Sequence, residues 1–304
     1  MRILVTGGAG FIGSNLCNTL ASEGHDVLAY DDEYLGKRSN LSKEVRFVGC
    51  SVVMGSETRL TFSHFEPEIV FHLAAASSSP MFKEQEFWGL DTNIMGFVRV
   101  MHYARKTGAK KVIYASSSSL YSGNAVPWIE TLPITPRTFY EASFKAREDI
   151  AAAYYGQYGY PSIGMRFFSV YGPNERHKGE YANNITQFLW SIKNNERPVV
   201  YGDGTQARDF IYVDDVVQAL KLAMDYDKEG IFNVGTGQAT SFNEVLRILD
   251  KRLDEPVRPL YVDNPIGPNY IPKTLADTTL AEEELGFKAH ITVDEGINRL
   301  MSVY

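Results

Sequence analysis

The sequence predicts an α/β protein with a doubly wound parallel sheet of about seven strands and a smaller α+β substrate-binding lobe toward the C-terminus. Short apolar runs alternate with helical patterns for more than half of the chain, which is typical of a parallel sheet covered on both faces. The first two apolar runs enclose a glycine-rich turn and an amphipathic stretch. After Phe168 the pattern changes to short elements with many prolines, which predicts a second lobe.

The apolar runs, taken in order, define the strands, because a run bounded by turn residues suits a strand buried on both faces. The predicted strands are Arg2–Thr6, Asp26–Tyr30, Arg46–Val48, Ile69–His72, Lys111–Ala115, Ser162–Phe168 and one near Ile231–Val234. The predicted helices lie near Gly10–Glu23, Ser56–Phe65, Glu84–Thr107, Tyr140–Tyr158 and Asp214–Tyr226.

The predicted sheet domain covers residues 1–168 with returning segments near 210–235, and the lobe covers 169–209 and 236–304. The lobe should lie over the carboxyl ends of the strands, where open α/β sheets bind ligands. Its markers are Tyr171-Gly172-Pro173-Asn174, a helical run near Ala182–Asn194, the turn Gly202-Asp203-Gly204 and prolines from Pro256 to Pro272.

The stretch from Arg2 to Asp32 has the order of elements that dinucleotide binding requires: strand, glycine turn, helix, strand and carboxylate. Gly7 permits a tight turn, Gly10 lets backbone approach a pyrophosphate, and Gly13 lets the helix lie against the sheet. The free N–H groups at the start of that helix would face the phosphates. A bound dinucleotide is therefore expected.

Asp31, at the end of the second strand, can accept hydrogen bonds from the adenine-ribose hydroxyls. Its negative charge would repel a 2′-phosphate, so NAD is predicted rather than NADP. Lys37 and Arg38 follow closely and leave NADP as the alternative.

Composition excludes several classes of function. A net charge of −7 and the lack of a long basic run argue against a nucleic-acid surface. No apolar run approaches the roughly 20 residues of a membrane span, and the six histidines show no metal-binding spacing. Cys17 and Cys50 are interpreted as small buried hydrophobes, so we expect a cytoplasmic protein without a metal site.

Further motifs extend along nearly the whole chain. They are Phe71-His72-Leu73-Ala74-Ala75, Thr92-Asn93-Ile94-Met95-Gly96, Ala115-Ser116-Ser117-Ser118, Tyr140, Arg166-Phe167-Phe168-Ser169-Val170-Tyr171-Gly172-Pro173, Gly202-Asp203-Gly204 with Arg208-Asp209-Phe210, and Phe232-Asn233-Val234-Gly235-Thr236-Gly237. As a set they resemble the extended short-chain dehydrogenase/reductase superfamily, and most nearly its nucleotide-sugar epimerases, typified by UDP-glucose 4-epimerase.

The resemblance implies a Rossmann sheet, bound NAD and epimerisation of a UDP-hexose through a transient 4-keto sugar. Tyr140 would take a sugar hydroxyl proton, and Ser117, or Ser118 in the run of serines, would hold the reacting oxygen. For the cofactor it implies Gly7, Gly10, Phe11, Ile12, Gly13, Asp31, Asp32, Gly36, Lys37, Ser51, Val52, Leu73, Ala74, Ala75, Asn93, Ser116, Tyr140 and Phe168. For the substrate it implies Ser77, Ser117, Ser118, Ser169, Asn183, Tyr201 and Arg208.

The main departure from the superfamily follows Tyr140. The superfamily pattern places a lysine four residues after the tyrosine, where this chain has Phe144. Position 144 lies roughly 40° around a helix from Tyr140, whereas Lys145 lies about 140° away. Three accounts are open. In the first, the positive nicotinamide ring, Ser117 and water support Tyr140 as a base. In the second, Lys145 takes the place of the missing lysine through a π-bulge in the helix. In the third, the protein binds NAD and a sugar nucleotide without turnover.

Other reactions of the superfamily stay open. Relatives that eliminate water or carbon dioxide tend to have an acid within the segment occupied here by Ser116-Ser117-Ser118-Ser119, so dehydration and decarboxylation fall behind epimerisation and ketoreduction. A non-catalytic binding protein on the same scaffold is a further alternative.

The two long helical stretches pair between subunits in relatives, so a homodimer is expected. Their apolar positions equally suit packing on the sheet. These positions are Phe97, Val100, Met101, Ala104, Ala151, Ala152 and Tyr155.

Overall fold

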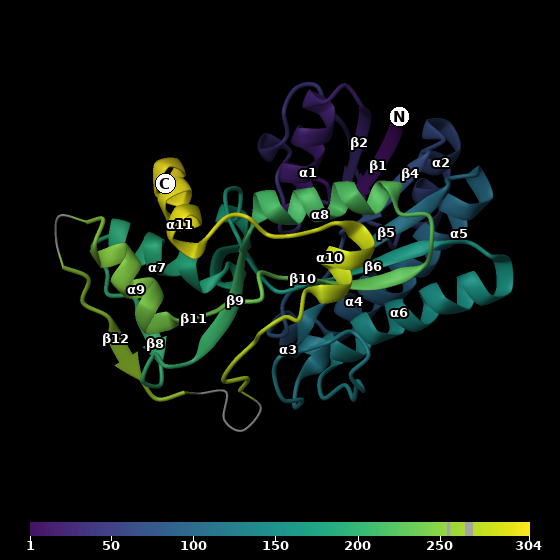
Figure 1. Cartoon of the computed structure of the whole chain (residues 1–304). Coiled ribbons are helices and arrows are strands. Elements are labelled where there is room, and N and C mark those ends of the chain that lie inside the picture. The colour runs from purple at the N-terminus through teal and green to yellow at the C-terminus, as the bar shows by residue number, and fades with distance from the viewer. Residues whose placement is uncertain (254–255, 265–269) are drawn as a thin grey trace.

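The centre of the computed structural model, which describes residues 1–253, 256–264 and 270–304, is a seven-stranded parallel sheet (Figure 1). Its strand order is β10-β6-β5-β4-β1-β2-β3. The strands are β1 (Arg2–Thr6), β2 (Asp26–Asp31), β3 (Arg46–Gly49), β4 (Ile69–His72), β5 (Lys111–Ser117), β6 (Ser162–Phe167) and β10 (Gly230–Val234). All seven predicted strands are present, and the doubly wound fold class is confirmed.

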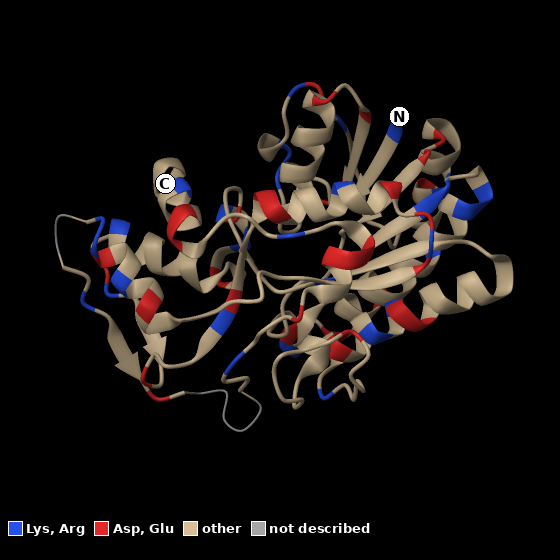
Figure 2. Ribbon diagram, in the orientation of Figure 1, with Lys and Arg blue, Asp and Glu red and all other residues tan. Residues whose placement is uncertain are grey.

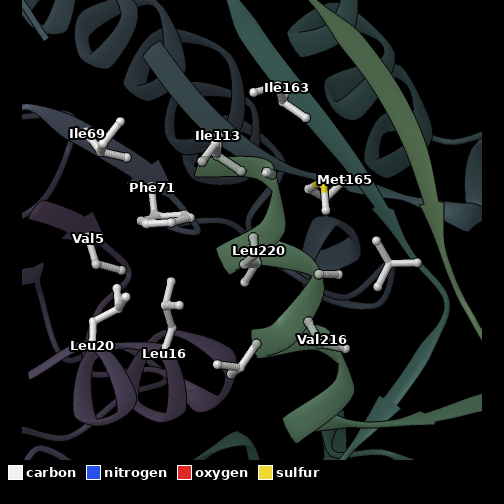
Figure 3. Close-up of a cluster of buried hydrophobic side chains, with 14 of the residues drawn as sticks. Val5, Leu16, Leu20, Ile69, Phe71, Ile113, Ile163, Met165, Val216 and Leu220 are labelled. Atoms are coloured by element: carbon white, nitrogen blue, oxygen red, sulfur yellow. The ribbon is translucent and has the colours of Figure 1, made fainter. Parts of the chain in front are cut away.

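Helices cover both faces of the sheet because its strands alternate apolar side chains between two cores. Ile3 and Val5 of β1 lie in the core on one face, and Leu4 lies in the core on the other. Figure 3 shows part of the first core, where Leu16 and Leu220 approach the sheet. The first face carries α1 (Phe11–Ser22), α8 (Val213–Asp225) and α10 (Thr279–Leu285), and the second carries α2 (Gly55–Phe65), α5 (Gly96–Thr107) and α6 (Phe139–Tyr158).

The predicted helix Glu84–Thr107 is wrong as a single element. The chain forms α3 (Met81–Glu84), α4 (Glu86–Leu90) and the π-helical turn η2 (Asp91–Met95) before α5 begins. The π-helical turn includes Asn93, which is fully buried. The side-chain amide of Asn93 accepts from the backbone N–H of Ala76 and donates to its carbonyl oxygen. The backbone carbonyl oxygen of Asn93 accepts from Arg147 Nε at 2.8 Å. The π-helical turn coincides with these contacts. The break between α3 and α4 falls earlier, at Gln85, whose backbone is non-helical with a φ of −135° and a ψ of 54°.

The C-terminal lobe lies beside the sheet (Figure 1). In it, β9 pairs with β7 and β11, and β8 pairs with β12. Residues 265–269 of the proline-rich tail lie outside the described residues. The lobe elements are β7 (Ser169–Tyr171), η4 (Arg176–Tyr181), α7 (Asn184–Lys193), β8 (Val199–Tyr201), β9 (Ala207–Tyr212), β11 (Ala239–Ser241), α9 (Phe242–Asp250), β12 (Leu260–Val262) and α11 (Val293–Val303). Two short helical turns lie outside the lobe, η1 (Arg38–Asn40) and η3 (Ser118–Tyr121).

Charged residues of both signs are interspersed over the sheet domain and the lobe (Figure 2). Within the described ranges, no helix combines the length and apolarity needed to cross a membrane. The apolar positions considered for a subunit interface divide into two groups. Ala152 and Tyr155 are exposed, whereas the others pack in the core: Phe97, Val100, Met101, Ala104 and Ala151.

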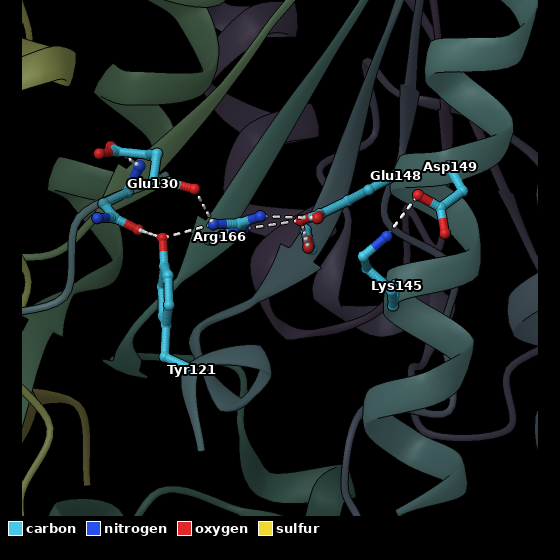
Figure 4. A network of polar contacts seen from close by, with 8 residues as sticks. Tyr121, Glu130, Lys145, Glu148, Asp149 and Arg166 are labelled. Carbon is cyan, nitrogen blue, oxygen red and sulfur yellow. Dashed lines mark hydrogen bonds and ion pairs between the residues drawn. The ribbon is translucent and has the colours of Figure 1, made fainter. Parts of the chain in front are cut away.

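A buried ion pair ties α6 to the sheet (Figure 4). Arg166 of β6 donates to both carboxylate oxygens of Glu148, at 2.8 and 2.7 Å, and both side chains are at most 4% exposed. Burial alone would lower the pKa of Arg166, but the bond and charge of Glu148 raise it above its ordinary value. Arg166 also donates to the Tyr121 hydroxyl, which donates to Asn233 of β10. The network therefore links α6, β6 and β10.

Glu148→Gln should lower the free energy of unfolding by about 3 to 5 kcal/mol, because it leaves the Arg166 charge buried without its partner. The matched control is Asp149→Asn, which breaks the exposed pair with Lys145 on the same helix and should cost less than about 1 kcal/mol. Urea denaturation measures both. Equal losses for the two variants would contradict this account of the pair.

Candidate functional site

A cavity of about 490 Å³ lies at the carboxyl ends of β1, β2, β4, β5 and β6. The chain leaves β1 toward β2 on one side and returns to β4 on the other, so the cavity includes the point where strand order reverses. Ligands of open α/β sheets bind at such points. The lobe supplies part of the wall through Lys178, Asn183 and Arg208.

The glycine turn between β1 and α1 leaves no room for side chains. Gly7 has a φ of +70°, and a Cβ there would lie 2.6 Å from the Ala74 nitrogen. A Cβ on Gly13 would overlap the Gly7 carbonyl oxygen. Helix α1 therefore begins directly above the turn, after Gly10, with its first N–H groups at the cavity wall. This cradle fits the pyrophosphate of a dinucleotide.

Asp31 lies at the end of β2 in the same wall. Its carboxylate accepts from the backbone N–H groups of Ala9 at 3.0 Å and Glu33 at 2.7 Å. Burial raises the pKa of Asp31, and these two bonds oppose that effect by favouring the charged form. The carboxylate is thus fixed beside the glycine turn, where it can meet a ribose.

Tyr140 and Ser117 form a pair of neighbouring hydroxyls in the cavity wall. The Tyr140 hydroxyl lies 3.2 Å from Ser117 Oγ and 3.4 Å from the Ser77 carbonyl oxygen. Burial raises the pKa of Tyr140, while the Ser117 hydrogen bond and the charge of Arg147 lower it. A sugar hydroxyl bound here can meet both oxygens.

The structure separates the four serines by role. Ser117 Oγ faces Tyr140 and also accepts from the Ser119 N–H. Ser116 donates to Glu148 at 2.7 Å, so its hydroxyl belongs to the buried ion-pair network. Ser118 lines the cavity. Ser117 is therefore the serine in contact with the phenol.

Most predicted site residues lie together in the cavity wall. Arg208 is held between aromatic rings, with its guanidinium 5.3 Å from the Tyr270 ring centroid and 5.7 Å from that of Phe242. Burial lowers its pKa. The predicted cofactor residues in the wall are Gly7, Gly10, Phe11, Ile12, Gly13, Asp31, Gly36, Leu73, Ala74, Ala75, Ser116, Tyr140 and Phe168. The predicted substrate residues in the wall are Ser77, Ser117, Ser118, Ser169, Asn183 and Arg208.

Several predicted cofactor residues lie outside the wall. Asp32 accepts from the Tyr34 N–H, and Lys37 Nζ donates to the Glu33 carbonyl at the surface. The Ser51 carbonyl accepts from the Tyr30 hydroxyl. Their contacts in this structure are within the protein.

Three further predicted residues also lie outside the cavity wall. Val52 is buried in the core of the second face, and the Asn93 side chain is occupied by Ala76 and Ser143. Tyr201 lies in β8 of the lobe and is 43% exposed. A direct contact of these three residues with a ligand stays a prediction.

Lys145, for which a catalytic role is one of the predicted accounts, lies outside the cavity wall. Helix α6 is regular from Phe139 to Tyr158, so it lacks the π-bulge that would turn Lys145 inward. The Lys145 ammonium pairs with Asp149 one turn along the outer face (Figure 4). Phe144 instead occupies the wall, with its ring 5.0 Å from that of Tyr140.

Sequence reasoning missed part of the wall. Tyr34 and Trp88 pack with ring centroids 4.4 Å apart near the glycine turn, and Lys178 of η4 lies 5.4 Å from the Phe11 ring centroid. No local pattern marked these residues, because segments distant in sequence bring them together. The other missed wall residues are Leu35, Ala115, Ser119, Phe167, Val170, Tyr181, Ile271 and Thr274. Within the described ranges, no group of three His, Cys, Asp or Glu side chains is arranged to hold a metal.

Comparison with known proteins adds to this geometry. The sequence pattern of the NAD-dependent epimerase/dehydratase family matches residues 3–235. The chain is 33% identical to UDP-glucose 4-epimerase of Mycolicibacterium smegmatis, across 100% of this chain and 98% of that protein. Its fold is similar to UDP-glucose 4-epimerase of Thermotoga maritima solved with UDP-glucose, with a TM-score of 0.93, 32% identity and coverage of 100% and 98%. The Thermus thermophilus UDP-glucose 4-epimerase solved with NAD has a TM-score of 0.89, 28% identity and the same coverage.

Asp31→Ser should reduce the preference for NAD over NADP by about tenfold or more, because it removes the charge that a 2′-phosphate meets. Asp32→Ser is the matched control, since it removes the same charge from the neighbouring residue outside the wall. Calorimetric titration of protein freed of bound nucleotide measures both preferences. An equal effect of the two substitutions would show that general charge, not the Asp31 position, selects the dinucleotide.

Proposed function

Because the chain belongs to the NAD-dependent epimerase/dehydratase family, we propose that it is a UDP-hexose 4-epimerase that works through a transient 4-keto sugar. The observation that carries the proposal is the Ser117–Tyr140 pair, with oxygens 3.2 Å apart, in the wall of the dinucleotide cavity. NAD, the cofactor of this family, supplies the group that accepts and returns a hydride.

The two residues of this pair have distinct tasks. Tyr140 takes the proton of the sugar hydroxyl, and Ser117 holds the same oxygen by a hydrogen bond. Tyr140 then gives the proton back to the same sugar oxygen. The product is the 4-epimer because the turned sugar presents the opposite face of C4 for return of the hydride. The aromatic rings of Phe82 and Phe144 pack against Tyr140 and exclude water from its edge.

The lobe residues suit the nucleoside diphosphate. Arg208 can bind phosphate oxygens with two N–H groups. Lys178, which pairs with Glu175 at 3.7 Å, lies in the same wall. Asn183 lines the cavity between these elements and the sheet, although its side chain also caps α7. A substrate anchored by its diphosphate can turn its sugar while it stays bound.

Dehydration and decarboxylation are less well supported. Among the described residues of the cavity wall, Asp31 is the only carboxylate. It lies at the end of β2, three strand spacings from β5, which corresponds to about 14 Å from the Ser117–Tyr140 pair. An elimination needs an acid or base beside the reacting carbon in addition to Tyr140, and the serines there do not supply one.

A homodimer is part of the proposal. Exposed apolar side chains lie on one helix, with Tyr155 at 45% and Tyr158 at 48% exposure. Together with Ala152 they offer a contact face on α6 for a second copy of the chain. Sedimentation equilibrium tests this part separately from the chemistry.

The test of function is turnover of a panel of UDP-, GDP- and dTDP-sugars by the purified protein with NAD. We expect interconversion of UDP-glucose and UDP-galactose without net formation or consumption of reduced cofactor. Consumption of reduced cofactor in proportion to product would instead identify a ketoreductase. Binding of NAD and UDP-sugars without turnover of any member would identify a binding protein.

Tyr140→Phe should reduce kcat by about 10²-fold or more while NAD affinity changes little, because it removes the proton acceptor and keeps the ring. Tyr155→Phe, on the exposed face of the same helix, is the control and should leave kcat unchanged. Steady-state kinetics measure both. Full activity in Tyr140→Phe would exclude the phenol from the reaction.

A further inference from the structure

Arg147 lies on the same face of α6 as Tyr140. Seven residues correspond to about two helical turns, so Tyr140, Phe144 and Arg147 form one row. Arg147 is fully buried, whereas Lys145 points to the outer surface. The row therefore places a positive charge behind the phenyl ring that replaces the expected lysine.

Every hydrogen bond of the Arg147 guanidinium goes to a neutral oxygen. Nε donates to the Asn93 carbonyl at 2.8 Å, and Nη2 donates to the Ala74 carbonyl at 2.9 Å and to the Asn93 side chain at 3.2 Å. Nη1 donates to the Ala115 carbonyl at 3.3 Å. Within the described ranges, no carboxylate lies at ion-pair distance from Arg147.

The other buried arginine on this side of the sheet shows the contrast. Arg166 is neutralised by two hydrogen bonds to Glu148, the residue next to Arg147. The negative charge of Glu148 is therefore paired with Arg166 and not with Arg147. Arg147 keeps its charge in a medium of low polarity, where an uncompensated charge acts over a longer distance than in water.

Phe144 connects this charge with the phenol. The Arg147 guanidinium lies 4.9 Å from the Phe144 ring centroid, and the Phe144 ring lies 5.0 Å from the Tyr140 ring at 67°. A ring face attracts a cation, so Phe144 holds Arg147 in place without neutralising it. Water is excluded between them because Phe144 is only 3% exposed.

On the premise of the proposed function, in which Tyr140 is the proton acceptor, we propose that Arg147 supplies from behind Phe144 the positive charge that stabilises the Tyr140 phenolate. Arg147 is a positioning residue, since the sugar and cofactor need not touch it. It takes over the electrostatic task of the absent lysine but not its hydrogen bond to the cofactor.

The charged and titratable surroundings fit this assignment. Burial lowers the pKa of Arg147 to about 9, which leaves it protonated at neutral pH, and its charge lowers the pKa of Tyr140. Glu141, on the same helix, opposes it by raising the pKa of Tyr140. The other groups near Tyr140 and Arg147 are the Ser117 hydroxyl and the Tyr114 phenol of β5, and the Tyr181 phenol of η4, which packs on the same apolar cluster as Tyr140. His72 of β4 also lies there. Its burial, and secondly the charge of Arg147, lower the pKa of His72 well below its ordinary value.

Arg147→Lys and Arg147→Gln separate charge from structure. Lysine keeps the charge with fewer and differently directed donors, and glutamine keeps two N–H donors without the charge. Tyrosine labelled with ¹³C at Cζ reports ionisation by NMR, and Tyr140→Phe assigns the signal among the 18 tyrosines. Circular dichroism with heating shows that each variant is folded.

With a unit charge at roughly 10 Å and an effective dielectric constant near 20, Arg147→Gln should raise the pKa of Tyr140 by about one unit. The limb of the kcat profile that rises with pH should move in the alkaline direction by the same amount, with about tenfold lower kcat at neutral pH. Arg147→Lys should shift the Tyr140 pKa less than Arg147→Gln at each pH where the lysine is protonated. An unchanged Tyr140 pKa in folded Arg147→Gln would overturn the proposal.

Phe144→Lys provides a second test that does not change residue 147, and circular dichroism with heating shows whether this variant is folded. Because the phenol already has a stabilising charge, this substitution should change kcat at neutral pH by less than about threefold. A gain of tenfold or more, together with a Tyr140 pKa lowered by about one unit or more in the NMR titration, would mean that Arg147 does not perform the task. The NMR titration needs no substrate, so a protein without epimerase activity would overturn the proposed function and still give a result for Arg147.

Discussion

The attachment of helix α6 to the carboxyl ends of β4 and β5 is the constraint on which the site depends. Arg147 binds the carbonyl oxygens of Ala74 and Ala115, and Glu148 binds Arg166 in β6. Because adjacent residues of one helix hold it to three strands, the row that contains Tyr140 has little freedom to move. The phenol is thereby fixed beside Ser117 in the cavity wall.

The glycine turn and the strands could be predicted from sequence because their signals are local. Gly7 and Gly13 occur where a side chain would overlap backbone, and the apolar runs match strands of the observed sheet. Arg147 could not be predicted, since a charged residue within a polar helical stretch is ordinarily assigned to solvent. Its burial depends on backbone carbonyl oxygens of three segments that are distant in sequence, at Ala74, Asn93 and Ala115, and no local pattern indicated that they meet.

The site limits the chemistry by what surrounds the phenol. A hydroxyl and aromatic rings adjoin Tyr140, while the single carboxylate of the described wall binds the backbone beside the glycine turn. Such surroundings can move one proton to and from a sugar oxygen and exclude water. They do not provide the second acid or base that elimination requires. The proposed reversible oxidation at one carbon needs no such second group.

The central claim is that one hydride leaves a sugar carbon and returns to the same carbon on the opposite face. The most direct measurement is conversion of UDP-glucose carrying deuterium at C4, followed by mass spectrometry and NMR of the product. The account predicts UDP-galactose with the deuterium retained at C4 and none released in reduced cofactor or water. Product with ordinary hydrogen at C4, or deuterium lost to the medium, would contradict it.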